Sequence, residues 1–275
     1  MIKDISVRLA TAIGFSAWVL GSLYYNQWSY LLLFIIIAFA CSYEYYRVIL
    51  KDSSTMRNIL HALFVACLPL LAYISIESDI SILYSMLAVT GLVIFSVFTL
   101  RLNGPPRDPI GFTAPLISGA SYIGIPCMMA IFIAYLPGTF TYLPLMGVIP
   151  LIWANDTGAY LTGSMLGKTP LYPAISPKKT VEGTLGGWII CILCAFPLSK
   201  LNPVYTLQEW LLIAVLTGLA AIVGDLIESK FKRYYSIKDT GTFLPGHGGF
   251  LDRFDSFLYL MPYIYAYSLI NTLSN

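Results

Sequence analysis

Long apolar runs, separated by short polar stretches, follow one another along almost the whole chain. An α-helix rises 1.5 Å per residue, so about 20 apolar residues are needed to cross a hydrocarbon core about 30 Å thick. Runs of this length predict membrane-spanning helices. The nine expected spans are residues 9–24, 29–47, 58–76, 80–100, 110–135, 144–166, 182–199, 208–228 and 256–273. Pro115 and Pro126 can kink or split the fifth run, so eight and ten spans are alternative counts.

Composition favours the same class of protein. The 275 residues are 57% hydrophobic and only 11% charged, whereas soluble domains have about 25% charged residues. We therefore predict an all-α polytopic membrane protein. The net charge of +2 is small, and no basic patch is interleaved with aromatic residues, so nucleic acid is not an expected partner.

The basic residues predict the orientation of these spans, because Lys and Arg accumulate in cytoplasmic loops. With nine spans, all 16 Lys and Arg residues except Lys200 fall on one side. We therefore expect the N-terminus and the basic loops in the cytoplasm, and the C-terminus on the far side. Residues 1–135 are expected to form a scaffold of transmembrane helices with a region for dimer contacts. Residues 136–275 are expected to carry the catalytic loops.

The first polar cluster is the stretch WANDTGAY in the sixth span, where Asp156 lies about halfway along. An ionised carboxylate at the centre of a bilayer costs at least about 2.5–3.5 kcal/mol. One interpretation is a helix–helix hydrogen bond from Asn155, Asp156 or Thr157, with Gly158 and Gly163 allowing close approach. The other is a polar cavity that opens to the cytoplasm.

The second cluster lies in residues 167–187, where three prolines exclude a regular helix and predict a structured loop. Thr180 is a plausible N-cap of the seventh span, with Glu182 in its first turn. Lys178 and Lys179 precede that helix N-terminus and are suited to hold an anion. The alternative is that these lysines only mark the cytoplasmic side of the membrane.

The third cluster follows the eighth span. Asp225, Glu228, Ser229 and Lys232 share one face of a helix that extends past the span. The sequence KDTGTFLPGHGGFLDRFD, residues 238–255, comes next and ends where the ninth span begins.

Glycines and two aspartates give this last stretch its chemistry. Gly246, Gly248 and Gly249 can adopt positive φ angles and bring backbone N–H groups close to an anion. His247 is interpreted either as a phosphate contact or as a group that structures the loop. Asp252 and Asp255, three residues apart, are expected to project from one face as the ninth helix begins.

Carboxylates from two helices at a polar membrane boundary favour a hard divalent cation. Asp225, Asp252 and Asp255 are the candidate ligands. Mg²⁺ prefers oxygen ligands and is completed by water and substrate phosphates. Carboxylates for a metal beside cations for phosphate are what phosphoryl or nucleotidyl transfer requires. We expect Mg²⁺ at this place and leave a second metal ion open.

The 27 residues from Ser229 to Asp255 resemble the signature of the CDP-diacylglycerol synthases, or phosphatidate cytidylyltransferases. The match runs from SKFKR through KDTG to LPGHGGFLDRFD without a departure. The stretches NDTGAY and SPKKTVEG are also similar to that family, so the resemblance covers roughly residues 153–255.

This resemblance implies transfer of CMP from CTP to phosphatidic acid with Mg²⁺, by a homodimer. The compact N-terminus predicts the inner membrane of a bacterial cell. The implied catalytic residues are Asp225, Asp252, Asp255 and Lys179, of which the three aspartates hold the metal. Asp156 would aid metal binding or contact the cytosine. The implied substrate contacts are Asn155, Asp156, Ser176, Lys178, Thr180, Glu182, Ser229, Lys232, Arg233, Lys238, Asp239, His247, Gly248, Gly249 and Arg253.

Two other functions remain alternatives. One is a related cytidylyltransferase or kinase that acts on another membrane lipid, since contacts to an acceptor tail are merely apolar. The other is an anion transporter with Asp156 as a midplane site, which predicts broken helices in two repeated halves. The carboxylate pattern of the CDP-alcohol phosphotransferases, D-G followed by G-x-x-x-D-x-x-x-D, is absent.

Overall fold

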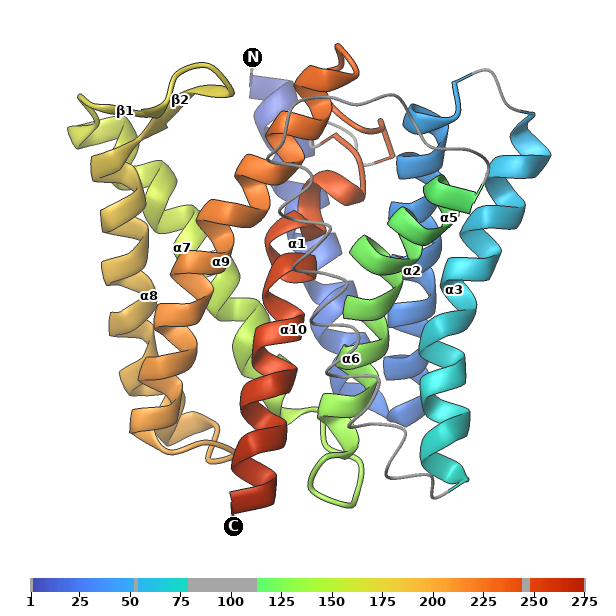
Figure 1. Ribbon diagram of the computed structural model, residues 1–275. Helices are drawn as coiled ribbons and strands as arrows, with labels where there is room; N and C mark the ends of the chain where they lie inside the picture. Colours follow the sequence, from blue (N-terminus) through green and yellow to red (C-terminus); the bar gives the residue numbers. More distant parts are fainter. Residues whose placement is uncertain (1, 52–53, 79–112, 244–247, 275) are drawn as a thin grey trace.

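The structure is a computed structural model that describes residues 2–51, 54–78, 113–243 and 248–274. The helices run roughly side by side and form a bundle (Figure 1). Figure 1 shows the N-terminus at the same end as a small hairpin and the C-terminus at the opposite end. The expected fourth span, residues 80–100, lies outside the described residues.

The described residues of the N-terminal half form three long helices and one composite rod. The helices are α1 (Ile2–Tyr25), α2 (Gln27–Ile49) and α3 (Thr55–Glu77). The rod consists of α5 (Thr113–Gly119), the π-helical turn η1 (Ala120–Gly124) and α6 (Ile125–Tyr135). The expected interruption of the fifth run is therefore a π-helical turn, a feature that inserts extra backbone into a helix without ending it.

The C-terminal half contributes four long helices: α7 (Leu143–Leu166), α8 (Val181–Leu201), α9 (Leu207–Tyr234) and α10 (Leu251–Ser274). The expected loop between α7 and α8 contains an antiparallel hairpin, β1 (Pro170–Tyr172) and β2 (Ser176–Thr180). The hairpin is the structured loop that the prolines predicted, and the rest of the described chain is consistent with the all-α class. Prolines that cannot enter a helix are tolerated in a two-stranded ladder, where each strand is an edge.

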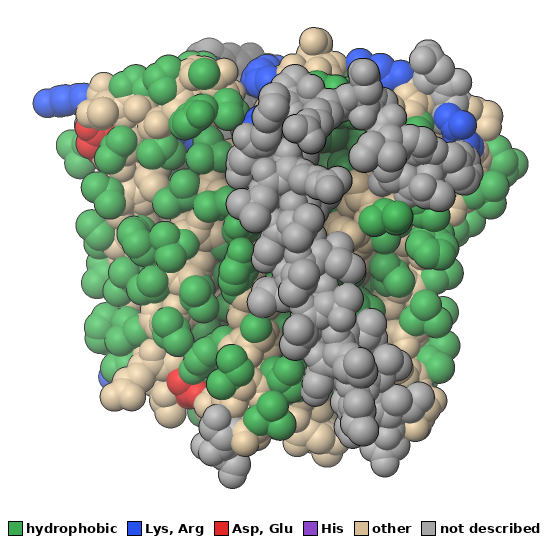
Figure 2. All heavy atoms as spheres, in the orientation of Figure 1, with side chains coloured by type: hydrophobic (Ala, Val, Ile, Leu, Met, Phe, Trp, Pro, Cys, Tyr) green, Lys and Arg blue, Asp and Glu red, His purple; other side chains and the backbone are tan. Residues whose placement is uncertain are grey.

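Among the described residues, five helices are long and apolar enough to cross a membrane. They are Gln27–Ile49, Thr55–Glu77, Pro115–Tyr135, Val181–Leu201 and Leu207–Tyr234. Figure 2 shows hydrophobic side chains at mid-height on both flanks of one face, with Lys and Arg gathered mainly toward the hairpin end. This distribution fits a membrane protein, while nine spans and a cytoplasmic hairpin end remain predictions.

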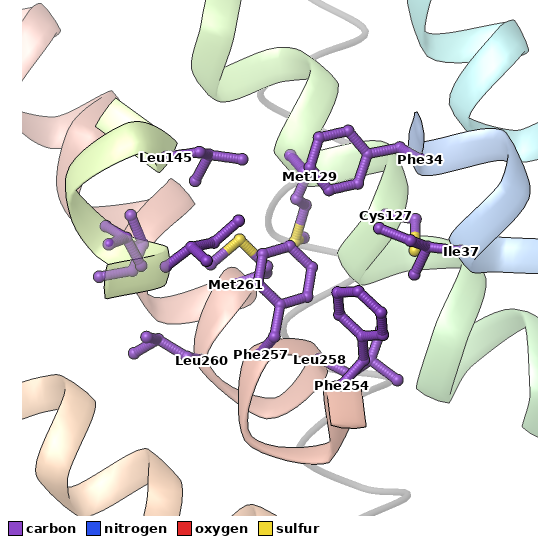
Figure 3. Packing of buried hydrophobic residues seen from close by; sticks show 14 of the residues in the cluster. Phe34, Ile37, Cys127, Met129, Leu145, Phe254, Phe257, Leu258, Leu260 and Met261 are labelled. Carbon is purple, nitrogen blue, oxygen red and sulfur yellow. The ribbon is translucent and has the colours of Figure 1, made fainter. Parts of the chain in front are cut away.

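The core joins the two halves of the chain. Phe34 of α2 stacks on Phe257 of α10 with ring centroids 5.8 Å apart, and Met129 of α6 lies beside them (Figure 3). Leu258 and Met261 of α10 are fully buried in the same cluster. Burial of these side chains stabilises α10 in the middle of the bundle. This packing fixes the position of the first turn of α10 at the hairpin end.

Candidate active site

Three carboxyl groups meet where α9 and α10 approach each other near the hairpin end. Asp225 and Glu228 come from α9, and Asp255 comes from the first turns of α10. One oxygen of each lies within 4.8 Å of the others. Gly224 makes this possible, because a Cβ there would lie only 3.0 Å from the carbonyl oxygen of Asp255. We call Asp225, Glu228 and Asp255 the carboxylate group.

Glu228 belongs to this group although the sequence led us to expect Asp252 in its place. The Glu228 side chain is 2% exposed, and its Oε2 lies 2.6 Å from Lys232 Nζ. Its Oε1 is buried and forms no direct hydrogen bond with any described residue. A buried acceptor without a partner costs about 1–3 kcal/mol, so its retention points to a ligand. The available signal was its position three residues after Asp225 on the same helical face.

Asp252 shares Lys232 with Glu228 and also accepts hydrogen bonds from the backbone. Lys232 Nζ donates to Asp252 Oδ1 at 3.0 Å, and the backbone N–H groups of Gly249 and Thr240 donate to Oδ2 at 2.8 and 3.1 Å. The side chain is 6% exposed. We call residues 240–251 the glycine-rich segment. In this structure Asp252 organises that segment and Lys232, and its role as a metal ligand remains a prediction.

The glycine-rich segment is described only at its ends, because residues 244–247, including Gly246 and His247, lie outside the described residues. Gly248 has the expected positive φ, +86°. Gly249 does not point its N–H into an open anion nest, since it donates to Asp252. Gly249 thus acts within the protein in this structure.

A cavity of about 450 Å³ lies between α7, α8, α9 and the hairpin. It contains seven of the side chains expected to contact substrate or metal. They are Asn155, Asp156, Ser176, Lys178, Lys179, Thr180 and Asp225. Asp225 belongs to both the cavity and the carboxylate group, so the two features form one continuous site.

Asp156 is an exposed side chain in this cavity, and Asn155 donates a long hydrogen bond of 3.4 Å to it. The structure supports the cavity and the close approach at Gly158, while the hydrogen bond from Asn155 stays within α7. A Cβ on Gly158 would lie 3.1 Å from the Cα of Gly187, so the glycine does allow α7 and α8 to pack closely. The carboxyl group nevertheless faces the cavity.

Lys179 connects the cavity with the carboxylate group. It reaches from β2 and forms an ion pair with Asp225, with the two side chains 34% and 28% exposed. Burial lowers the pKa of the Lys179 ammonium group from its ordinary value, because desolvation disfavours the charged form. Lys178 is more exposed and lines the cavity beside it.

Glu182 holds the hairpin rather than the cavity. Its carboxylate accepts hydrogen bonds from the backbone N–H groups of Lys168 and Thr169, both at 3.1 Å. Thr180 is the predicted N-cap, accepting from the N–H of Gly183 at 3.1 Å. The position of Glu182 at the helix start was predicted correctly, but its partners are the chain's own backbone.

The remaining expected contacts surround this site. Ser229 donates to Asp225 Oδ1 at 3.1 Å, and Arg233 Nε lies 3.5 Å from the carbonyl oxygen of Ile175 in the hairpin. Exposed side chains near the glycine-rich segment are Lys238, Asp239 and Arg253. The structure therefore groups α9, the hairpin and the start of α10 around one site.

Comparison with known proteins agrees with this geometry. A model of the cytidylyltransferase family matches residues 6–271. A phosphatidate cytidylyltransferase of Staphylococcus aureus (strain COL) is 50% identical over 115 residues, which cover 41% of this chain and 44% of that protein.

Two further relatives carry the same name. The one from Bacillus subtilis (strain 168) is 50% identical over 117 residues, or 42% of this chain and 43% of that protein. The one from Staphylococcus saprophyticus is 46% identical over 114 residues, or 41% and 44%. Each alignment thus spans less than half the length of the curated relative.

Proposed function

This chain belongs to the cytidylyltransferase family, and on that premise we propose that it transfers CMP from CTP to phosphatidic acid. The products are CDP-diacylglycerol and pyrophosphate. The observation that carries the proposal is the carboxylate group, with its unpartnered Glu228 oxygen, beside a cavity lined by Lys178 and Lys179. The name shared by the relatives supports the same choice of substrates.

The proposed reaction is a displacement at phosphorus. A phosphate oxygen of phosphatidic acid attacks the α-phosphorus of CTP, and a new P–O bond forms. The bond from that phosphorus to the bridging oxygen of the β-phosphate breaks, and pyrophosphate leaves with the electron pair. Because the lipid phosphate is already anionic, no Ser or Cys nucleophile is required. The protein's task is to position two polyanions and offset their repulsion.

The carboxylate group fits Mg²⁺. It offers only oxygen ligands, from Asp225, Glu228 and Asp255, within a span of 4.8 Å, and one of those carboxyl groups has a buried oxygen without a partner. Hard divalent cations prefer such oxygens. When bound, the ion offsets the negative charge of the phosphates. We propose these three residues as the metal ligands, with Asp252 orienting Lys232 and the glycine-rich segment.

The cationic side chains have separate proposed tasks. Lys178 and Lys179 line the cavity and neutralise the triphosphate, and Lys179 exchanges Asp225 for phosphate when CTP enters. Arg233 holds the hairpin against α9. Asn155 and Asp156 face the same cavity and contact the nucleotide.

We place the hairpin end in the cytoplasm of a bacterial cell, with the chain integral to its membrane. CTP is cytosolic and phosphatidic acid lies in the bilayer, so their reaction needs a site at the inner boundary. The distribution of Lys and Arg supports this side. A homodimer remains a prediction from the family resemblance.

The experiment is an acceptor panel with purified protein in detergent, Mg²⁺, and CTP labelled in the α-phosphate. We expect a labelled lipid with phosphatidic acid, and one pyrophosphate released per labelled lipid. Label on a different acceptor, such as a polyprenyl phosphate, with none on phosphatidic acid would identify the alternative lipid substrate. No labelled product from any acceptor would overturn the proposal.

A further inference from the structure

Glu44 of α2 is a buried carboxyl group that reaches the catalytic half of the chain. It lies in the region expected to be scaffold, and the residue is 7% exposed. Its Oε2 accepts a hydrogen bond from the hydroxyl of Thr240 at 3.1 Å and another from the backbone N–H of Leu251 at 3.0 Å. Leu251 is the first residue of α10. Glu44 therefore contacts both limbs of the glycine-rich segment, which are residues 240–241 and residues 249–251.

The two limbs are shaped to receive this carboxyl group. A Cβ atom on Gly241 would overlap Glu44 Oε1, and one on Gly249 would overlap Glu44 Oε2. Glycine at both positions leaves room for an acidic side chain between residues 240–241 and 249–251. The absence of a Cβ thus has a steric reason here, beyond any freedom of the backbone.

Asp252 holds the same two limbs through other atoms. Thr240 donates its hydroxyl to Glu44 and its backbone N–H to Asp252. Asp252 also accepts from Gly249 and Lys232, and Lys232 pairs with Glu228. A continuous series of polar contacts therefore runs from Glu44 to the carboxylate group. Such networks couple their members more strongly than isolated pairs.

A contact with substrate is a poor explanation for Glu44. It is buried, its Oε2 accepts hydrogen bonds from Thr240 and Leu251, and it is not among the residues that line the 450 Å³ cavity. A plain helix cap is the other explanation, because an acceptor at a helix N-terminus satisfies a backbone N–H. A helix cap needs only the hydrogen bond to the backbone N–H of Leu251. Glu44 also accepts a hydrogen bond from Thr240 and fits against Gly241 and Gly249, which a cap does not require.

We propose that Glu44 is a positioning residue, which fixes the start of α10 so that Asp255 stays within the carboxylate group. This inference rests on one part of the proposed function, namely that the carboxylate group holds a divalent cation. Groups that orient metal ligands typically change metal affinity or activity by about 10–100-fold when they are removed. A cap that only stabilises the fold changes neither quantity below the unfolding temperature.

The test uses the full chain in detergent with Glu44→Ala, Glu44→Gln and the control Ser42→Ala. Ser42 is fully buried on α2, and its hydroxyl bonds a carbonyl group of the same helix. Mn²⁺ replaces Mg²⁺ as the probe, and its binding is followed by electron paramagnetic resonance. Hydrogen–deuterium exchange reports on the backbone N–H groups of Thr240, Gly249 and Leu251.

In Glu44→Ala we expect Mn²⁺ to bind about 10-fold more weakly or worse and exchange at the three N–H groups to accelerate. Glu44→Gln keeps an acceptor oxygen of the same reach, so its Mn²⁺ affinity should lie closer to the wild type. Ser42→Ala should match the wild type in both measurements. Wild-type Mn²⁺ affinity and exchange in Glu44→Ala would overturn the proposal.

If Glu44→Ala does not fold, Thr240→Val tests the positioning role of Glu44 instead. It removes the hydroxyl bond to Glu44 and leaves the backbone bond to Asp252. We expect weaker Mn²⁺ binding in this variant, and wild-type binding and exchange would count against Glu44. CMP transfer by the wild type is measured beside these readouts. If the wild-type protein binds Mn²⁺ but transfers no CMP, the proposed function is contradicted. The role of Glu44 is then still tested by the Mn²⁺ affinity and the exchange rates of its variants.

Discussion

Lys232 Nζ lies 3.0 Å from Asp252 Oδ1, so a lysine of α9 neutralises the first aspartate of α10 within the protein itself. The same ammonium group lies 2.6 Å from Glu228 Oε2. The two side chains of the first pair are 13% and 6% exposed, so water does little to screen them. Lys232 therefore links the glycine-rich segment, through Asp252, to the carboxylate group, through Glu228.

Lys232→Met should destabilise the protein strongly. It leaves two largely buried carboxyl groups without their cation, and loss of one partner from a buried ion pair costs about 3–5 kcal/mol. A thermal unfolding scan in detergent measures the change. Lys238→Met, at an exposed position, is the matched control. Equal unfolding midpoints for the two variants would show that Lys232 does not hold this part of the structure.

Asp255→Asn and Asp252→Asn should fail in different ways. Asp255 belongs to the carboxylate group, so Asp255→Asn should abolish Mn²⁺ binding and transfer without faster exchange at Thr240. Asp252 accepts backbone N–H groups, so Asp252→Asn should accelerate exchange at Thr240 and Gly249. Identical profiles for the two variants would contradict the separate roles assigned to them.

Glu228→Gln tests the ligand that the sequence did not single out. The amide keeps the volume of the side chain but removes the carboxylate oxygen that lies buried without a partner. We expect the half-saturating Mg²⁺ concentration for transfer to rise by about 10-fold or more. Glu182→Gln is the control, because that carboxylate accepts from the backbone of Lys168 and Thr169, just before the hairpin, and does not line the cavity. A normal Mg²⁺ response in Glu228→Gln would exclude it as a ligand.

Much of the fold could be predicted from the apolar runs. The expected span at residues 144–166 is α7 (Leu143–Leu166), and the expected span at 182–199 is α8 (Val181–Leu201). The ninth span was expected from residue 256, and its helix was expected to begin with Asp252 and Asp255 on one face; α10 begins at Leu251. Hydropathy marks only the apolar part of this helix, because its first two turns also carry Asp252, Arg253 and Asp255.

Part of the site was expected because the motifs that carry the family resemblance are expected to share one site. Asp156, Lys178, Lys179 and Asp225 lie far apart in the sequence, and the structure brings them together around one cavity. Contacts from segments outside those motifs were not predictable. Glu44 and Leu251 lie more than 200 residues apart, and nothing in the local sequence of α2 indicates a partner in α10.

Gly187→Ala should disturb the packing that shapes the cavity. A Cβ at this position would lie 2.8 Å from the Cβ of Ala159 and 2.9 Å from its backbone nitrogen. Overpacking of this kind typically costs about 1–3 kcal/mol. Gly14→Ala is the control, since no atom lies within 4 Å of a Cβ there. The unfolding midpoint should fall only in Gly187→Ala, and an equal response of both variants would contradict close packing of α7 on α8.

The most direct test of the proposed reaction compares CTP labelled in the α-phosphate with CTP labelled in the γ-phosphate, using the purified protein, phosphatidic acid and Mg²⁺. Transfer of CMP predicts that the α-label enters the lipid while the γ-label leaves entirely in pyrophosphate. Entry of the γ-label into the lipid would contradict the account and identify a lipid kinase instead.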